Sequence, residues 1–171
     1  YGFGYAKFTH TADGIIQENE VFVPKEDKLK INLINLKNTT DKLKKISIFY
    51  YLKPVLTSIF PFVCNSSSPK TEENIVYAIN RYDELIDETT FVSSNLDIDS
   101  FTGRKKSFIG NDTIKKPVAL FINSLDNSNG LGEESCIAIK INVELKAYES
   151  KNISLILSKL LINNATGFFI V

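Results

Sequence analysis

SCIAIKINVELK, residues 135–146, is the stretch that decides the fold. Its odd-numbered positions from 137 to 145 are all apolar, whereas the even-numbered positions from 140 to 146 are Lys, Asn, Glu and Lys. Successive side chains of a β-strand point to opposite faces, so this alternation predicts a long, half-buried strand. After the turn around AYESKN, the alternation resumes in ISLILS, residues 153–158, and the two segments predict an antiparallel hairpin.

The same period of two recurs along the rest of the chain. It predicts further strands over residues 5–11, 15–23, 28–36, 46–52, 74–80, 89–93 and 118–122. In 46–52 both sets of alternating side chains are bulky, which is typical of a central strand covered on both sides. Helical periodicity is scarce, with a turn or two expected in RYDELIDE, residues 81–88. Many strands separated by turn signals indicate an all-β fold, an antiparallel β-sandwich.

Length and composition predict one soluble globular domain. The 171 residues suffice for a single core, and 43% hydrophobic and 23% charged residues are ordinary for such a domain. Twenty cations balance twenty anions, so there is no basic excess to favour a nucleic acid or a membrane surface as partner. Because the sequence contains no methionine, even at its start, we expect a single sandwich domain over 1–171, excised from a longer chain.

Few residues are suited to catalysis or to metal binding. Cys64 and Cys136 match neither a disulfide framework nor a zinc motif, which favours reduced thiols in a cytoplasmic protein. His10 is the only histidine, so it is the one imidazole available as a general base, and nothing beside it completes a triad. We therefore predict no catalytic residue, no metal site and no cofactor.

Acidic pairs are plentiful, but their spacing does not predict a carboxylate mechanism. Glycoside hydrolysis requires two carboxylates that face each other across a cleft, whereas neighbours on a strand point to opposite faces. We interpret the pairs as solvated charges: Asp83 with Glu84, Asp97 with Asp99, and Glu133 with Glu134.

Aromatic residues leave two interpretations open. Seven Tyr and twelve Phe, with no Trp, gather in YGFGYAKF, IFYYL and FPF. Aromatic side chains dominate the cores of β-sandwiches, so filling the core is the simpler role. Rings on an exposed sheet face would instead stack on a sugar, as in many carbohydrate-binding sandwiches.

FTGRKKSFIG, residues 101–110, is the most conspicuous charged segment. It carries three consecutive cations, Arg104, Lys105 and Lys106, with a glycine on either side. A phosphate-binding loop has the pattern G-x-x-x-x-G-K-[ST] between a strand and a helix, and this segment lacks both the spacing and a following helical pattern. We interpret it as a positively charged connection between strands, within a long loop from 94 to 116.

Four motifs, taken in order, carry a family resemblance. They are a G-x-G-Y-x-x-F-x-H start, an F-V-P element, a T-G-R-x-x-x-F-I-G loop and a G-x-G-x-E-x-C-x-A element. This succession resembles the N-terminal β-sandwich of glycoside hydrolase family 94, formerly glycosyltransferase family 36. The matching residues are Gly2, Gly4, Tyr5, Phe8, His10, Phe22, Val23, Pro24, Thr102, Gly103, Arg104, Phe108, Ile109, Gly110, Gly130, Gly132, Glu134, Cys136 and Ala138.

The resemblance covers the chain from residue 1 to about residue 159, although it fades between 59 and 83. The family pattern often has T-G-D-R, so the aspartate before Arg104 is missing here. The family includes cellobiose phosphorylase, 1,2-β-oligoglucan phosphorylase and cyclic β-1,2-glucan synthase. Among these branches, the chain looks closest to the β-1,2-glucan group.

What the resemblance implies is an accessory role. Family members are inverting phosphorylases or glycosyltransferases whose general acid lies on a separate (α/α)6 barrel, and the sandwich is of the super-sandwich, galactose-mutarotase-like type. The expected partners are that barrel, a β-glucan or glucoside and a second copy of the sandwich. Residues 159–171 are expected to begin the linker toward the barrel. The chain alone is then not an enzyme.

The resemblance also selects the candidate site. Arg104 and Lys105, in the family-like loop, are expected to face the barrel and to contact a sugar hydroxyl, a carboxylate or phosphate. An alternative from another functional class is a free-standing carbohydrate-binding module without a catalytic partner. Measurable glucan affinity through an exposed aromatic strip would favour that module, whereas an apolar patch without glycan affinity would favour a docking face.

Overall fold

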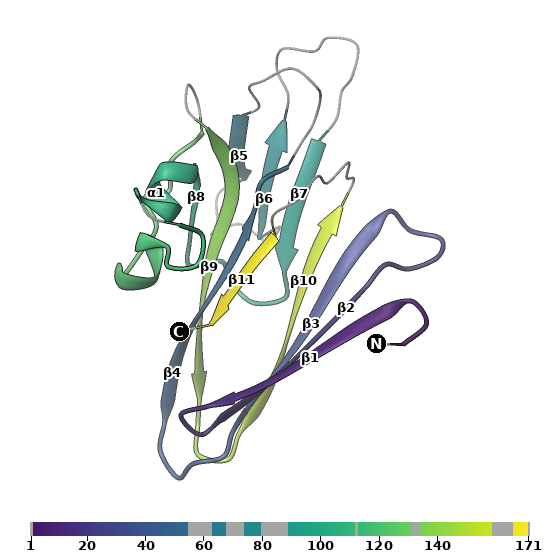
Figure 1. Cartoon of the computed structure of the whole chain (residues 1–171), viewed down its shortest axis with the longest axis vertical. Helices are drawn as coiled ribbons and strands as arrows, with labels where there is room; N and C mark the ends of the chain where they lie inside the picture. The colour runs from purple at the N-terminus through teal and green to yellow at the C-terminus, as the bar shows by residue number, and fades with distance from the viewer. Residues whose placement is uncertain are drawn as a thin grey trace.

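The computed structural model describes residues 2–54, 63–67, 74–79, 89–111, 113–130, 134–158 and 166–170. Over these ranges the chain is built almost entirely of strands (Figure 1). The elements are β1 (Tyr5–Ala12), β2 (Ile15–Phe22), β3 (Leu29–Asn38), β4 (Lys44–Leu52), β5 (Val63–Ser67), β6 (Ile75–Ile79), β7 (Thr89–Ser94), β8 (Ser100–Arg104), α1 (Lys105–Ile109), the 3-10 helix η1 (Val118–Phe121), β9 (Ser135–Leu145), β10 (Ser150–Ser158) and β11 (Thr166–Ile170).

The strands form two sheets in which the neighbouring strands are antiparallel. The larger sheet has the order β1-β2-β3-β10-β7-β6-β5, and the smaller one has the order β11-β4-β9-β8. The hairpin predicted from the alternation is a connection between sheets, because β9 pairs with β4 and β8 while β10 pairs with β3 and β7. The predicted antiparallel β-sandwich is confirmed, although its central hairpin is split between the two layers.

The main core fills the space between the sheets. The odd-numbered side chains of β9 and the even-numbered side chains of β4 point into it, as the alternation predicted. They pack against β3, β6, β7 and β10 of the larger sheet. Its fully buried members include Ile34, Leu36, Ile48, Val76, Ala78, Val92, Ile137, Ile139, Ile141, Leu145, Ile153, Leu155 and Leu157.

A second core covers the other face of the smaller sheet. There, α1 and η1 lie against β4, β8 and β9 (Figure 1), and the cluster consists of Phe49, Tyr51, Phe108, Ile109, Ala119, Leu125, Cys136 and Ala138. The prediction of a half-buried β9 is therefore wrong for its first half, since residues 135–141 are buried on both faces. Even Lys140 is only 5% exposed, because its ammonium donates to the carbonyl of Asn123 and lies 5.7 Å from the ring centroid of Phe49.

Two segments near α1 differ from the sequence expectation. The loop predicted over 94–116 contains β8 and α1, because Phe101 enters the main core and Phe108 enters the second one. The strand predicted over 118–122 is the 3-10 helix η1 instead. Val118 and Phe121 are 40% and 69% exposed, so the run packs on the second core through Ala119 and the partly buried Leu120, and it pairs with no strand among the described residues.

The end of the chain also contributes to the sheet. Strand β11 pairs with β4, with Thr166 opposite Leu52 and Ile170 opposite Ile48. Residues 166–170 thus belong to the smaller sheet, although they lie in the stretch where a linker was expected to begin. Residues 159–165, the helical turn expected over 81–88 and Glu133 lie outside the described residues.

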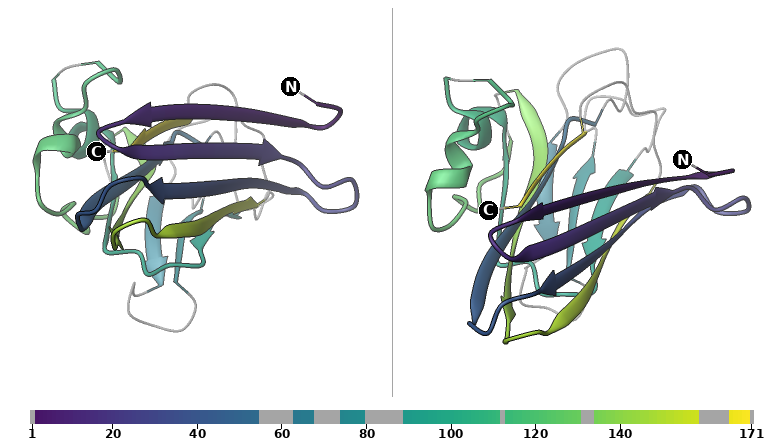
Figure 2. Two further views of the ribbon diagram at one scale, coloured as in Figure 1. Left: turned by 90° about the horizontal axis from the view of Figure 1, so that it is seen from below. Right: turned by 60° about the horizontal axis from the view of Figure 1, so that its bottom comes forward.

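The β1–β2 hairpin extends beyond the smaller sheet (Figure 2). Strand β1 is the edge of the larger sheet, and it is exposed along nearly its whole length on both faces. Strand β2, which lies between β1 and β3, is half-buried throughout. The outer strands of the larger sheet therefore carry surfaces that the sandwich itself does not cover.

Candidate functional site at the β8–α1 edge

The T-G-R-x-x-x-F-I-G loop, residues 102–110, and the motif that contains Glu134 come together at β8, an edge strand of the smaller sheet. Thr102 pairs with Ala138, and Arg104 pairs with Ser135 across a bulge in the ladder. The backbone N–H of Lys105 then donates to the carbonyl of Glu134, with an N–O distance of 2.9 Å. Segments that are distant in the sequence thus form one continuous surface.

Gly130 permits this close approach. A Cβ atom at this position would lie 2.3 Å from the carbonyl oxygen of Gly103 and 2.7 Å from Oγ of Ser135. The hydroxyl of Ser135 donates to the carbonyl of Gly130 at 2.7 Å, which holds the two backbones together. No residue with a side chain fits here without displacing backbone atoms, so the glycine in this motif has a packing reason.

Glu134 organises the cations of the site. Its carboxylate accepts hydrogen bonds from the ammonium of Lys105 and from that of Lys53, the latter at 3.2 Å. The hydrogen bonds from Lys105 and Lys53 lower the pKa of the Glu134 carboxyl below its ordinary value. Because the Glu134 side chain is 59% exposed, each pair contributes at most about 1 kcal/mol to stability, and its main effect is to fix where the ammonium groups lie.

Arg104 is held more loosely than Lys105. Its Nε donates to the carbonyl of Asn129 at 3.3 Å, and its backbone N–H donates to the hydroxyl of Thr102 at 3.2 Å. Within the part of the chain that the structure describes, its guanidinium has no carboxylate partner. A guanidinium presents five donors in a planar fork, so most of its hydrogen-bonding capacity is available to a ligand or to another domain.

Asp126, which no sequence pattern indicated, is exposed on the connection between η1 and β9. Burial raises the pKa of its carboxyl, but hydrogen bonds from Thr102, Ser128 and Ser107 together outweigh burial and lower it. The backbone N–H of Ser128 also donates to Asp126, at 3.2 Å. The carboxylate therefore ties the 126–128 segment to β8 and α1.

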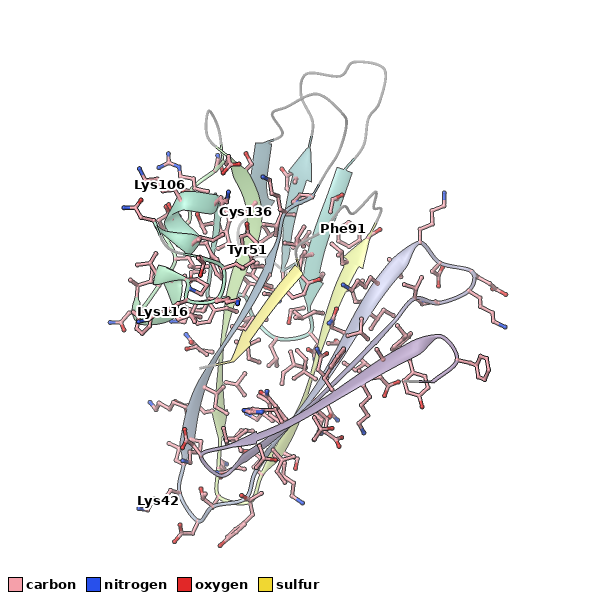
Figure 3. All side chains as sticks on the ribbon, viewed as in Figure 1. Lys42, Tyr51, Phe91, Lys106, Lys116 and Cys136 are labelled. Carbon is pink, nitrogen blue, oxygen red and sulfur yellow. The ribbon has the colours of Figure 1, made fainter. Side chains whose placement is uncertain are left out.

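An aromatic stack anchors α1 to the sheet. The ring of Phe108 stacks on that of Tyr51 with centroids 4.9 Å apart and planes at 20°, and it meets Phe49 edge-on at 6.2 Å. The thiol of Cys136 is buried beside them and donates to the carbonyl of Thr102 at 3.7 Å. Burial, followed by the charges of Cys136 and Glu134, raises the pKa of Tyr51. Figure 3 shows Tyr51 and Cys136 on the sheet beside α1.

The outward side of α1 and η1 is rich in cations. Lys106 and Lys116 project from this region in Figure 3, and both are exposed, as is Lys115. The ammonium of Lys116 lies 5.6 Å from the ring centroid of Phe121. With Arg104 and Lys105, these side chains form a cationic surface suited to a carboxylate, a phosphate or sugar hydroxyls.

Other candidate residues lie elsewhere. His10 lines a cavity of about 500 Å³ with Gln17, Lys44 and Lys45, between the β1–β2 hairpin and β4. Asp97 and Asp99 are exposed on the connection before β8. Among the described residues, no three His, Cys, Asp or Glu side chains are grouped to hold a metal ion. No helix within those residues is long and apolar enough to span a membrane.

Comparison with known proteins gives the family. The model of the "Glycosyl hydrolase 94, supersandwich domain" matches residues 1–166. N,N'-diacetylchitobiose phosphorylase of Vibrio furnissii is 24% identical over 123 residues, which are 64% of this chain and 15% of that protein. A solved structure titled "Putative kojibiose phosphorylase from human microbiome" has 10% identity and a TM-score of 0.41, over 98% of this chain and 18% of that one.

The chain thus spans only 15% and 18% of the lengths of these two proteins. The family resemblance of the four motifs is confirmed, because the family model extends across nearly all described residues. The motifs at β1–β2 and at β8–β9 are accordingly parts of one known domain type. The chain belongs to the glycosyl hydrolase 94 family, whose supersandwich domain it contains.

Proposed function

We propose that the chain is the accessory domain of a longer glycoside phosphorylase or glycosyltransferase, in which it supports a catalytic (α/α)6 barrel and shapes one side of its sugar site. The observation that carries this proposal is the cationic surface at β8–α1, where two family motifs meet and Arg104 keeps most of its donors unused. The small share of each relative that the chain covers supports a domain that works beside a larger one.

In this role, the residues of the edge would bind and orient rather than react. Arg104 would donate to a sugar hydroxyl, to a carboxylate of the barrel or to inorganic phosphate. Lys105, held by Glu134, would supply a fixed positive charge beside it. A phosphorylase consumes an anionic co-substrate, so cations at the rim of its site would raise the local phosphate concentration.

The chain by itself would not catalyse phosphorolysis, because the reacting carboxyl is expected on the barrel. Incubating the 171-residue chain with phosphate and a β-glucoside should release no sugar phosphate. Detection of a sugar phosphate above the level of a blank without protein would contradict this part of the proposal.

Three further features of the parent belong to the same proposal. A β-glucan or glucoside is the proposed substrate, with the β-1,2-glucan branch preferred because the motif succession most resembles it. A second copy would pack through the sandwich to give a homodimer. A reducing, cytoplasmic location is also proposed, because the two cysteines of the sequence match no disulfide framework.

Replacing Arg104 in the full-length protein tests the central claim. Arg104→Ala removes one charged hydrogen-bonding group, so kcat/KM for phosphorolysis should fall roughly tenfold or more, as expected for a loss of about 1.5–3 kcal/mol. Arg104→Lys keeps the charge but loses the planar, forked donors of the guanidinium. Its kcat/KM should therefore lie between those of the wild type and Arg104→Ala. Lys42→Ala, at an exposed turn far from α1 in Figure 3, is the control.

The result that would overturn the proposal is unambiguous. Wild-type kinetics together with wild-type assembly of Arg104→Ala would show that this edge neither contacts substrate nor supports the barrel. We expect Arg104→Ala to unfold like the wild type, because Arg104 makes only one side-chain hydrogen bond within the described chain. An unfolding curve of the variant checks that any loss of activity is not a loss of folding.

A further inference from the structure

A groove lies on the outer face of the larger sheet, away from the β8–α1 edge. It has a volume of about 380 Å³, within the 300–1,000 Å³ typical of small-molecule sites. Its walls come from β1, β2, β3, β10 and the turn after β7. Strands supply most of the lining, so the side chains project from a rigid support.

Three asparagine side chains form an ordered network in the groove. Nδ2 of Asn35 donates to Oδ1 of Asn152 at 2.6 Å, and Nδ2 of Asn95 donates to the carbonyl of Asn152 at 3.3 Å. Oδ1 of Asn95 accepts from the backbone N–H of Ser154 at 2.8 Å. These bonds fix the amide planes before any ligand arrives, which reduces the entropy cost of binding.

The network leaves three hydrogen-bonding groups of the groove unused. Among the described residues, Oδ1 of Asn35, Nδ2 of Asn152 and the hydroxyl of Ser154 receive no hydrogen bond and make none. They supply an acceptor, a donor and a group that acts as both. Hydroxyl groups of sugars likewise donate and accept, so this mixture suits a polyhydroxylated ligand.

Charged side chains at one end of the groove exclude an anion. Lys7 binds Glu18 at 3.1 Å, and Glu20 lines the same wall, so the three charges sum to minus one. A phosphate or an acidic peptide would meet net repulsion here, unlike at the β8–α1 edge. Among the described residues, the groove brings together too few carboxylates to hold a metal ion.

Apolar surface continues the groove along the sheet. Leu33, which lines it, is 42% exposed and gives an apolar floor. Tyr5 lies two residues from Lys7 on the same face of β1, opposite Phe22 of β2, and is 45% exposed. A Cβ at residue 2 would lie 2.1 Å from the Tyr5 ring, so Gly2 lets the backbone pack against this ring and hold it.

We propose that this groove binds a neutral oligosaccharide, with the asparagine network contacting hydroxyl groups and Tyr5 contacting the face of a sugar ring. The site is distinct from the barrel-facing edge and does not require a barrel. It would hold a stretch of glucan beside the catalytic region, so that successive chain ends remain nearby.

Binding of linear glucotetraoses to the 171-residue chain tests the proposal. Cellotetraose, laminaritetraose and sophorotetraose would be titrated to about 10 mM, which saturates a site with a Kd near 1 mM. Calorimetry gives the affinity, and backbone amide shifts in the NMR spectrum locate the site. At least one tetraose should bind, with shifts in β1, β2, β3 and β10.

Two variants and a matched control decide whether the groove is responsible. Asn35→Ala removes a network bond, and Ser154→Phe fills the groove without removing a side-chain hydrogen bond; each should weaken binding about tenfold or more. Asn142→Ala is the control, because Asn142 also makes a cross-strand side-chain bond, 2.9 Å to Ser47, but on the other sheet.

Three outcomes would overturn the proposal. They are the absence of binding by all three tetraoses, binding that Asn35→Ala and Ser154→Phe leave unchanged while their circular dichroism spectra are native, and binding that Asn142→Ala weakens equally. Since the assay involves neither phosphate nor phosphorolysis, its result is independent of the test on Arg104.

Discussion

Phe108→Ala is the change that most directly tests how α1 is held on the sheet. The Phe108 side chain is completely buried and joins the rings of Tyr51 and Phe49 in the second core. Truncation leaves a cavity beneath α1, whose other buried residue is Ile109. The helix cannot collapse onto the sheet without moving β8, since Lys105 is bonded to the backbone of Glu134.

The expected loss follows from burial. Buried Phe→Ala substitutions cost about 3–5 kcal/mol, and this includes the aromatic pairing of roughly 0.5–1.5 kcal/mol with Tyr51. Against a total stability of about 5–15 kcal/mol, such a loss removes a large part of the free energy of unfolding. With an m-value near 2 kcal/mol/M in urea, the unfolding midpoint should fall by roughly 1.5–2.5 M.

Urea unfolding followed by far-UV circular dichroism and tyrosine fluorescence measures this loss, because the chain contains seven Tyr and no Trp. Phe121→Ala is the matched control, as Phe121 is 69% exposed on η1 and should cost less than about 1 kcal/mol. If Phe108→Ala costs no more than Phe121→Ala, the second core does not stabilise the fold as argued. A double-mutant cycle with Tyr51→Leu should give a coupling of about 0.5–1.5 kcal/mol.

Three other changes have defined outcomes. Gly130→Ala forces a Cβ against the carbonyl of Gly103, so it should cost about 1–3 kcal/mol and lower Tm by several degrees in a thermal melt, whereas an unchanged Tm would refute the close packing. Burial raises the pKa of Tyr50 and Tyr51 above the unfolded value of about 10, so the unfolded state loses these protons first and stability should fall as pH rises above 10. Tyr51→Phe should flatten that decline in urea midpoints measured between about pH 9 and pH 11, and an equally steep decline would contradict the assignment. Glu134→Gln should change stability by less than about 1 kcal/mol while shifting the Lys105 Nζ signal in NMR spectra, and an unshifted signal would argue against the ion pair.

Alternation in the sequence predicted the strands whose two faces differ. Strands β3, β4 and β10 lie where the period of two placed them, because one face of each meets the main core and the other meets solvent or a second layer. Strands β1 and β2 also form where they were predicted, although β1 is exposed on both faces. Strand β8 was missed because its buried residues 100–103 include Ser, Thr and Gly, which read as a loop. Their burial comes from pairing with β9, a contact that no local pattern encodes.

The second core was predicted only at β4, where bulky side chains on both faces indicated a strand covered on both sides, which is confirmed. The elements that cover its outer face could not be predicted. The members of this core come from β4, α1, η1, β9 and, with Leu125, the segment after η1, and only their contact in the fold distinguishes those outside β4 from surface residues. The run at 118–122 has the composition of a strand, but it pairs with no strand among the described residues. It forms a 3-10 turn instead, from which Ala119 and Leu120 pack on the second core.

The candidate site was predicted in part. The family-like loop indicated Arg104 and Lys105 as candidate site residues, whereas Glu134 was interpreted as a solvated charge. The structure places Glu134 against both Lys105 and Lys53. Lys53 lies 81 residues before Glu134 in the sequence, so only the fold could identify it.

Strand β9 forms a wall of both cores, with Ile137 and Ile139 on one side and Cys136 and Ala138 on the other. Neither core can open by itself without exposing this strand to water. Its amide hydrogens should therefore exchange with deuterium only through global unfolding, whereas those of the exposed β1 should exchange through small local openings. The domain then combines a rigid central strand, β9, with a less protected edge strand, β1. A ligand that orders β1 would be detected as slower amide exchange in that strand.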